Sequence, residues 1–111
     1  MKPIKIGIAG LGNVGEEVAY QLIKGFRVQN DQFRIELRGV SAKSKDKNRK
    51  VDITNIPFFD DPISLSYSPD IDVVVELIGG DDGVAKDLCF SALKNKKGLI
   101  TAWTALKPNY G

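Results

Sequence analysis

The sequence contains no histidine and only one cysteine, and both scarcities limit the chemistry open to the chain. Without histidine, imidazole acid–base catalysis and histidine metal ligation are excluded within its 111 residues. Because Cys89 is the only cysteine, no intrachain disulfide can form; this suits a reducing compartment, and we expect the cytoplasm. No apolar run approaches membrane-spanning length, and Met1 leads almost directly into a strand pattern. We therefore expect neither a membrane partner nor a signal peptide.

A strong charge of one sign is also missing. Sixteen Lys and Arg residues against 14 Asp and Glu residues leave a net charge of +2, which is too small to indicate a nucleic-acid partner. The hydrophobic share of 42% and the charged share of 27% are typical of a soluble globular protein. The length predicts one domain over residues 1–111, large enough to fold without a disulfide or a metal.

Strand patterns and helical patterns alternate along the chain. Apolar runs predict strands over Ile4–Ala9, Arg34–Ser41, Ile71–Ile78 and Leu99–Ala102, and an irregular edge strand over Ile56–Asp60. Helical periodicity predicts helices from Asn13 to about Lys24 and over Gly83–Lys94, with a short helix opening at Asp61-Pro62. This alternation predicts an α/β fold, a doubly wound parallel sheet of about five strands in one domain.

Each of the two longer predicted helices has an apolar face. On the first helix the face comprises Val14, Val18, Ala19, Leu22 and Ile23. On the second it comprises Val84, Ala85, Leu88, Cys89, Ala92 and Leu93. We expect these faces to pack on the sheet, with Cys89 serving as packing rather than as a nucleophile.

A glycine motif joins the first strand to the first helix. Gly10, Gly12 and Gly15 form a GxGxxG pattern with a strand directly before it and a helix beginning within it. In a Rossmann-type βαβ unit these glycines permit the tight turn, the close approach of a pyrophosphate and the close packing of helix on strand. The amide groups of the helix N-terminus then face the phosphates. The alternative is a tight turn without a ligand, but the context favours dinucleotide binding.

The end of the second strand bears on the choice between NADP and NAD. NAD-binding domains often carry an acidic residue there, which accepts hydrogen bonds from the ribose. Here Ser41 and Lys43 occupy this region instead, and a hydroxyl with a cation suits a 2′-phosphate. The pattern favours NADP, although basic loop residues are also ordinary solvated surface. Glu36 lies mid-strand, and we assign it no cofactor role.

A second pair of glycines follows the strongest predicted strand. Gly79 and Gly80 stand at its carboxyl end, where ligands of parallel sheets bind. The alternative is a plain strand–helix turn with Asp82 as N-cap, and both interpretations can hold together. Glu76 lies inside this strand, and a carboxylate buried there needs a partner whatever its role.

Three segments together resemble the N-terminal domain of homoserine dehydrogenase. They are IAGLGNVG (residues 8–15), VVVELIGG (residues 73–80) and Ile100-Thr101-Ala102, and the second is the specific one. The resemblance implies NAD(P)-dependent interconversion of aspartate semialdehyde and homoserine, and a homodimer formed through a later domain. It also implies that Asn13 and Val14 join the three glycines in the pyrophosphate turn. Gly79 and Gly80 would lie beside the nicotinamide, and Thr101 at the rim of the last strand.

The chain departs from this family at two positions. The family usually continues Thr-Ala-Asn-Lys-Ala-Leu, with a lysine implicated in catalysis, whereas this chain has Trp103 and Thr104 in place of Asn and Lys. Threonine cannot supply an ammonium group. The domain with the family's substrate-binding carboxylates is also absent from the sequence. We therefore expect cofactor binding without turnover and assign no catalytic residue. A non-enzymatic dinucleotide-binding or interaction module is the alternative, and another small Rossmann dehydrogenase is a third.

Overall fold

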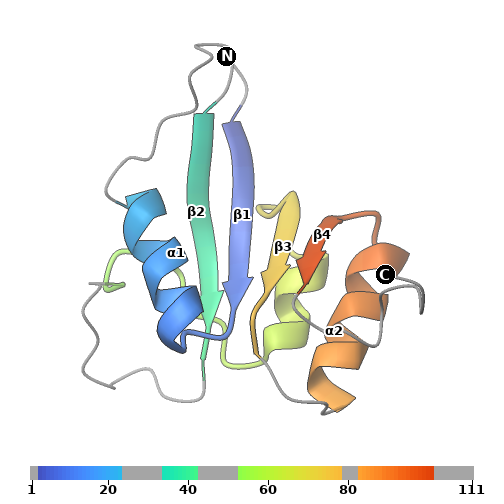
Figure 1. Ribbon diagram of the computed structural model, residues 1–111. Coiled ribbons are helices and arrows are strands. Elements are labelled where there is room, and N and C mark those ends of the chain that lie inside the picture. Colours follow the sequence, from blue (N-terminus) through green and yellow to red (C-terminus); the bar gives the residue numbers. More distant parts are fainter. Residues whose placement is uncertain (1–2, 24–33, 43–52, 79–82, 102–111) are drawn as a thin grey trace, which may run out of the picture.

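Four parallel strands form one sheet in the order β2-β1-β3-β4 (Figure 1). The computed structural model describes residues 3–23, 34–42, 53–78 and 83–101. Its strands are β1 (Pro3–Ala9), β2 (Arg34–Ser41), β3 (Val73–Glu76) and β4 (Gly98–Thr101). Its helices are α1 (Asn13–Ile23), the 3-10 helix η1 (Pro62–Tyr67) and α2 (Gly83–Lys94). The predicted α/β class with a parallel sheet is confirmed.

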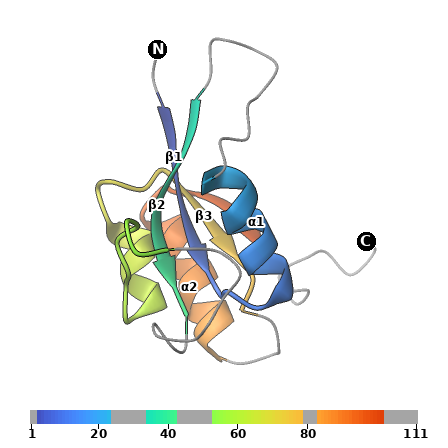
Figure 2. The ribbon, with the colours of Figure 1, turned by 90° about the vertical axis from the view of Figure 1, so that its left-hand side faces the viewer.

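Helices cover both faces of the sheet and divide the core into two layers. Figure 2 shows α1 and η1 on opposite sides of the strands. The core on the α1 side is built from Ile8, Leu11, Ala19, Leu37, Val40 and Val75. The core on the other side, under η1 and α2, is built from Ala9, Leu65, Ile71, Val74, Leu88 and Ala92. Neighbouring residues of β1 and β3 therefore face opposite layers, as the alternation of a strand requires.

A bulge in β2 shifts its pairing with β1 by one residue. Ile6 pairs with Leu37 and Gly7 with Gly39, so Arg38 is an extra residue on the β2 side. Added Cβ atoms at Gly7 and Gly39 would lie 2.7 and 3.0 Å from Cδ1 of Ile71. The two paired glycines thus make room for the residues that pack beneath η1.

The segment between β2 and β3 was predicted correctly only in part. The edge strand predicted over Ile56–Asp60 is wrong, because the segment forms only one bridge, between Phe58 and Val40. Pro57 lacks an N–H and takes part in that pairing only through its carbonyl, which accepts from the amide of Val40 at 3.0 Å. The sheet of the described residues therefore has four strands. The short helix was predicted correctly, with Asp61 as N-cap and Pro62 in its first turn.

The predicted apolar faces of the helices are too wide. Val14, Val84 and Leu93 are exposed, at 64%, 44% and 51%. Val14 and Val84 belong to the first turns of α1 and α2, and both helices begin at the carboxyl end of the sheet (Figure 1). Leu93 lies on the flank of α2, beside the buried stripe of Ala85, Leu88, Cys89 and Ala92. For Cys89 the prediction of a packing role is confirmed, since its side chain is fully buried.

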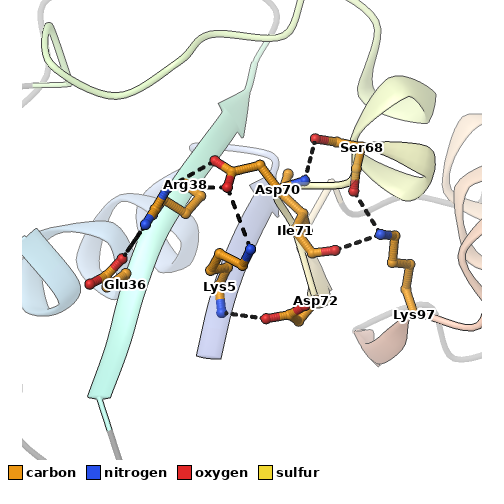
Figure 3. A network of polar contacts seen from close by, with 8 residues as sticks. All are labelled: Lys5, Glu36, Arg38, Ser68, Asp70, Ile71, Asp72 and Lys97. Carbon is orange, nitrogen blue, oxygen red and sulfur yellow. Dashed lines mark hydrogen bonds and ion pairs between the residues drawn. The ribbon is translucent and has the colours of Figure 1, made fainter. Parts of the chain in front are cut away.

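Arg38 links β2 to the segment that precedes β3 (Figure 3). Its guanidinium contacts Glu36 at 2.7 Å and Asp70 at 3.0 Å, and Lys5 Nζ approaches the same Asp70 carboxylate at 3.6 Å. The neighbouring carboxylates raise the pKa of Arg38, with the hydrogen bond to Glu36 as the largest cause. The charge of Glu36 is therefore engaged at mid-strand, away from the ends of the strands.

Lys97 fixes the backbone on the other side of the same segment. Its ammonium donates to the carbonyl oxygens of Ser68 and Ile71, both at 2.6 Å (Figure 3). Asp72 completes the link, because its carboxylate accepts from the backbone N–H of Lys5 at 3.0 Å. These contacts set where β3 begins beside β1.

Candidate functional site

The turn after β1 lies between the carboxyl ends of β2 and β3. The backbone N–H of Gly10 donates to the carbonyl of Ser41, at the end of β2, at 2.8 Å. On the other side, the N–H of Leu77, just past β3, donates to the carbonyl of Ala9 at 2.8 Å. The turn therefore stands at the edge of the sheet where ligands of parallel α/β folds bind.

Two of the three motif glycines are required by the protein itself. Gly10 has a φ of 98°, and a Cβ there would lie 2.7 Å from the carbonyl group of Leu77. A Cβ at Gly15 would lie 1.9 Å from the carbonyl oxygen of Gly10, so the first turn of α1 packs directly on the loop. Both positions must be glycine for the turn to close.

Gly12 is different, because nothing in the described chain requires a glycine there. An added Cβ would meet no atom within 4 Å, and its φ is outside the left-handed region. The residue is exposed. A bare backbone facing open space fits a position that a ligand approaches closely.

The open N-terminus of α1 adjoins Gly12. The first intrahelical bond runs from the N–H of Glu16 to the carbonyl of Gly12, at 2.8 Å. Helix geometry therefore leaves the amides of residues 13–15 without an intrahelical acceptor. These amides and the positive end of the helix dipole suit a phosphate group. Val14, beside them, exposes its side chain to solvent.

Of the remaining predicted site residues, the structure describes only Ser41 and Thr101. Ser41 is at the carboxyl end of β2, but only 2% of it is exposed. Lys43, Gly79 and Gly80 lie outside the described residues. Thr101, the last residue of β4, pairs in register with Glu76 and directs its hydroxyl hydrogen to that carboxylate.

Glu76 has the partners that its burial demands. Its side chain is fully buried, and one oxygen accepts from the Thr101 hydroxyl at 2.5 Å. The other accepts from the backbone N–H of Ile78 at 2.8 Å. The Cys89 thiol donates in turn to Thr101 at 3.4 Å. Burial raises the pKa of Cys89 and the charge of Glu76 acts in the same direction, while the hydrogen bond to Thr101 lowers it.

Comparison with known proteins identifies the family. Residues 10–106 match the family described as "Homoserine dehydrogenase, NAD binding domain". The chain belongs to this family. It is 38% identical over 114 residues to the homoserine dehydrogenase of Neisseria gonorrhoeae and 36% identical over 122 residues to that of Pseudomonas aeruginosa, and both alignments cover the whole chain. A crystal structure of the Staphylococcus aureus homoserine dehydrogenase matches 92% of the chain with a TM-score of 0.79 and 30% identity.

The chain spans about a quarter of these homoserine dehydrogenases. It covers 26% of the N. gonorrhoeae protein, 25% of the P. aeruginosa protein and 26% of the S. aureus chain. The family description makes it a dinucleotide-binding domain. Among the described residues, no helix is both long and apolar enough to traverse a bilayer, and no acidic or thiol cluster could hold a metal ion.

Proposed function

We propose that this chain binds the pyrophosphate of NADP at the turn Gly10–Gly15. The observation that carries the proposal is Gly12, an exposed glycine that neither backbone conformation nor packing requires. Gly10 and Gly15 hold the loop closed, and the free amides of residues 13–15 would donate to the phosphate oxygens. Asn13 and Val14 contribute backbone amides to this cradle.

The preference for NADP over NAD rests on the absence of an acid at the end of β2. Glu36, the nearest carboxylate on the strand, is bonded to Arg38. Lys43 would supply a cation for the 2′-phosphate, with Ser41 beside it. Because Ser41 is buried, its contribution would come through the backbone or after a local rearrangement, and Lys43 would carry most of the selectivity.

Within the family, such a domain serves the exchange of a hydride between aspartate semialdehyde and homoserine. The nicotinamide supplies the hydride chemistry, and the protein supplies binding and orientation. Gly79, Gly80 and Thr101 would line the nicotinamide side of the site. Trp103 and Thr104 replace the family's Asn and Lys, so we expect this chain alone to bind cofactor without turning over homoserine.

Trp103 and Thr104 also favour a second candidate, a dinucleotide-binding or interaction module without catalysis.

Calorimetric titration of the chain with NADPH and then NADH tests the binding proposal. Tighter binding of NADPH, and loss of that preference in Lys43→Ser, would support it. A folded chain that binds neither nucleotide would overturn it. A parallel assay with homoserine and NADP⁺ gives a one-sided check, because measurable turnover would exclude the non-enzymatic module and would also contradict the expectation that this chain alone is inactive.

A further inference from the structure

Glu76 ends a strand whose other residues are all valines. Val73, Val74 and Val75 are apolar, and a fourth apolar residue would bury itself at less cost than a carboxylate. Glu76 is nevertheless fully buried, and within the described part of the chain no cationic side chain pairs with it. A carboxyl group buried without a cationic partner depends on its hydrogen bonds, so the two partners of Glu76 show what its side chain does.

One oxygen of Glu76 fixes the backbone just beyond β3. The N–H of Leu77 still bonds to β1, but the next amide, that of Ile78, donates to the Glu76 carboxylate at 2.8 Å. The other carboxylate oxygen is anchored to β4 through the Thr101 hydroxyl. Glu76 therefore holds the peptide between Leu77 and Ile78 from a side chain that is itself held by the neighbouring strand.

That peptide lies against the dinucleotide turn. A Cβ at Gly10 would be 2.7 Å from the Leu77 carbonyl carbon and 2.8 Å from the Ile78 nitrogen. On its other side, Gly10 is in contact with Gly15 at the start of α1. Gly10 is thus held between the peptide that Glu76 fixes and the helix whose amides face the ligand. A shift of that peptide would move the whole cradle.

We propose that Glu76 is a positioning residue for the dinucleotide: through the Ile78 amide, and anchored by Thr101, it sets the place of the Gly10–Gly15 turn. The proposal rests on the proposed function, because the turn matters as a ligand site only if a dinucleotide binds there. The proposal also gives Thr101 a role: its hydroxyl donates its hydrogen to Glu76 and so anchors that carboxylate.

The test uses the full chain and three variants. Glu76→Met keeps the bulk of the side chain and removes both acceptors, and we expect the Kd for NADPH to rise about tenfold or more. Glu76→Gln keeps one carbonyl for the Ile78 amide, and its NH₂ group can donate to Thr101, so we expect a Kd within about threefold of wild type. The control is Ser66→Ala, which removes a buried hydroxyl bonded to the Ser91 hydroxyl and the Ile63 carbonyl, neither of them in the turn. It should lower stability and leave the Kd unchanged.

Amide NMR spectra of the same variants separate this inference from the binding proposal. In Glu76→Met the resonances of Gly10, Gly12 and Gly15 should shift, and in Glu76→Gln they should return toward wild type. If wild type binds no NADPH, the proposed function fails, while the glycine shifts still decide whether Glu76 positions the turn. If Glu76→Met binds NADPH like wild type, or leaves the three glycine resonances in place, the inference is overturned. Should Glu76→Met fail to fold, Thr101→Val provides the same comparison, with an expected intermediate loss of affinity.

Discussion

The carbonyl oxygen of Gly10 lies 1.9 Å from the point that a Cβ at position 15 would occupy. The obstruction is backbone, so no side-chain rotation can relieve it. Gly15 is therefore required by the packing of α1 on the end of β1, independently of any ligand. Gly12, three residues earlier, meets nothing within 4 Å. Packing within the protein thus requires glycine at position 15 but not at position 12. Substitutions at the two positions should therefore affect stability and ligand binding differently.

Replacing Gly15 with alanine should destabilise the free protein. The new methyl group can fit only if α1 moves away from the turn, and we expect a loss of about 2–4 kcal/mol in the free energy of unfolding. Urea denaturation followed by circular dichroism measures it. Unchanged stability would contradict the close packing of α1 against Gly10.

Replacing Gly12 with alanine should weaken NADPH binding while changing the stability of the free protein little. In the free protein the methyl group points into open space, and the poorer N-cap costs no more than about 1 kcal/mol. The methyl group would occupy the place of the pyrophosphate, so the Kd for NADPH should rise at least about tenfold, as calorimetry would show. Wild-type affinity in Gly12→Ala would exclude this turn as the phosphate site.

Lys96 offers a stabilising substitution outside the site. It follows α2 with a φ of 60°, its N–H bonds to Leu93 at 3.1 Å, and the N–H of Lys97 bonds to Ala92 at 2.9 Å. This pattern is a Schellman motif, in which glycine is the preferred residue at position 96. Lys96→Gly should therefore raise the free energy of unfolding by about 0.5–1 kcal/mol.

The matched control for that substitution is Lys94→Gly. Lys94 is the last residue of α2 itself, so glycine there should cost stability, by up to about 1 kcal/mol. Both variants remove one lysine charge, and their opposite signs in thermal or urea denaturation would isolate the backbone effect. Equal effects of the two variants would contradict it.

Cys89 should make stability depend on pH in the alkaline range. Burial raises its pKa in the folded state, so the unfolded chain releases the thiol proton at lower pH than the folded one. The stabilisation is complete below the unfolded-state pKa of about 8.5 and is lost as the pH rises through the folded-state value. Denaturation curves of wild type and Cys89→Ala between pH 7 and about 10 should therefore converge as the pH rises.

A thiol reagent gives an independent check on the same residue. As the only cysteine of the chain and a fully buried one, Cys89 should react with Ellman's reagent only when the protein opens. The reaction rate should rise with urea in step with unfolding. Rapid labelling of the native protein would contradict the burial on which the pH prediction rests.

The elements near the turn could be predicted from the sequence because their signals are local. The change from strand to helical periodicity falls at Asn13, where α1 begins, and the bounds of β2 and α2 agree with the structure. Asp61 followed by proline marks the start of η1 by side-chain and backbone chemistry alone. Such signals need no knowledge of the rest of the fold.

The partners of Glu76 could not be predicted in the same way. They come from the turn after β3 and from the end of β4, and only the parallel register brings Thr101 beside Glu76. The bulge at Arg38 could not be predicted either, because an extra residue in β2 is defined only by the pairing of β2 with β1. The exposure of Val14 depends on how α1 packs on the sheet, which its helical periodicity does not contain. Each of these features belongs to the assembled sheet.

The strand order also dictates when the turn can take its final shape. The Gly10 turn is supported by Leu77 and Ile78, and more than half of the chain must be synthesised between them. On the ribosome the glycine loop therefore emerges early. It gains its contacts with Leu77 and Ile78 only when β3 docks beside β1. Such distant pairing forms late and slowly. A nucleotide that needs the finished turn should leave the folding rate almost unchanged and act mainly by slowing unfolding.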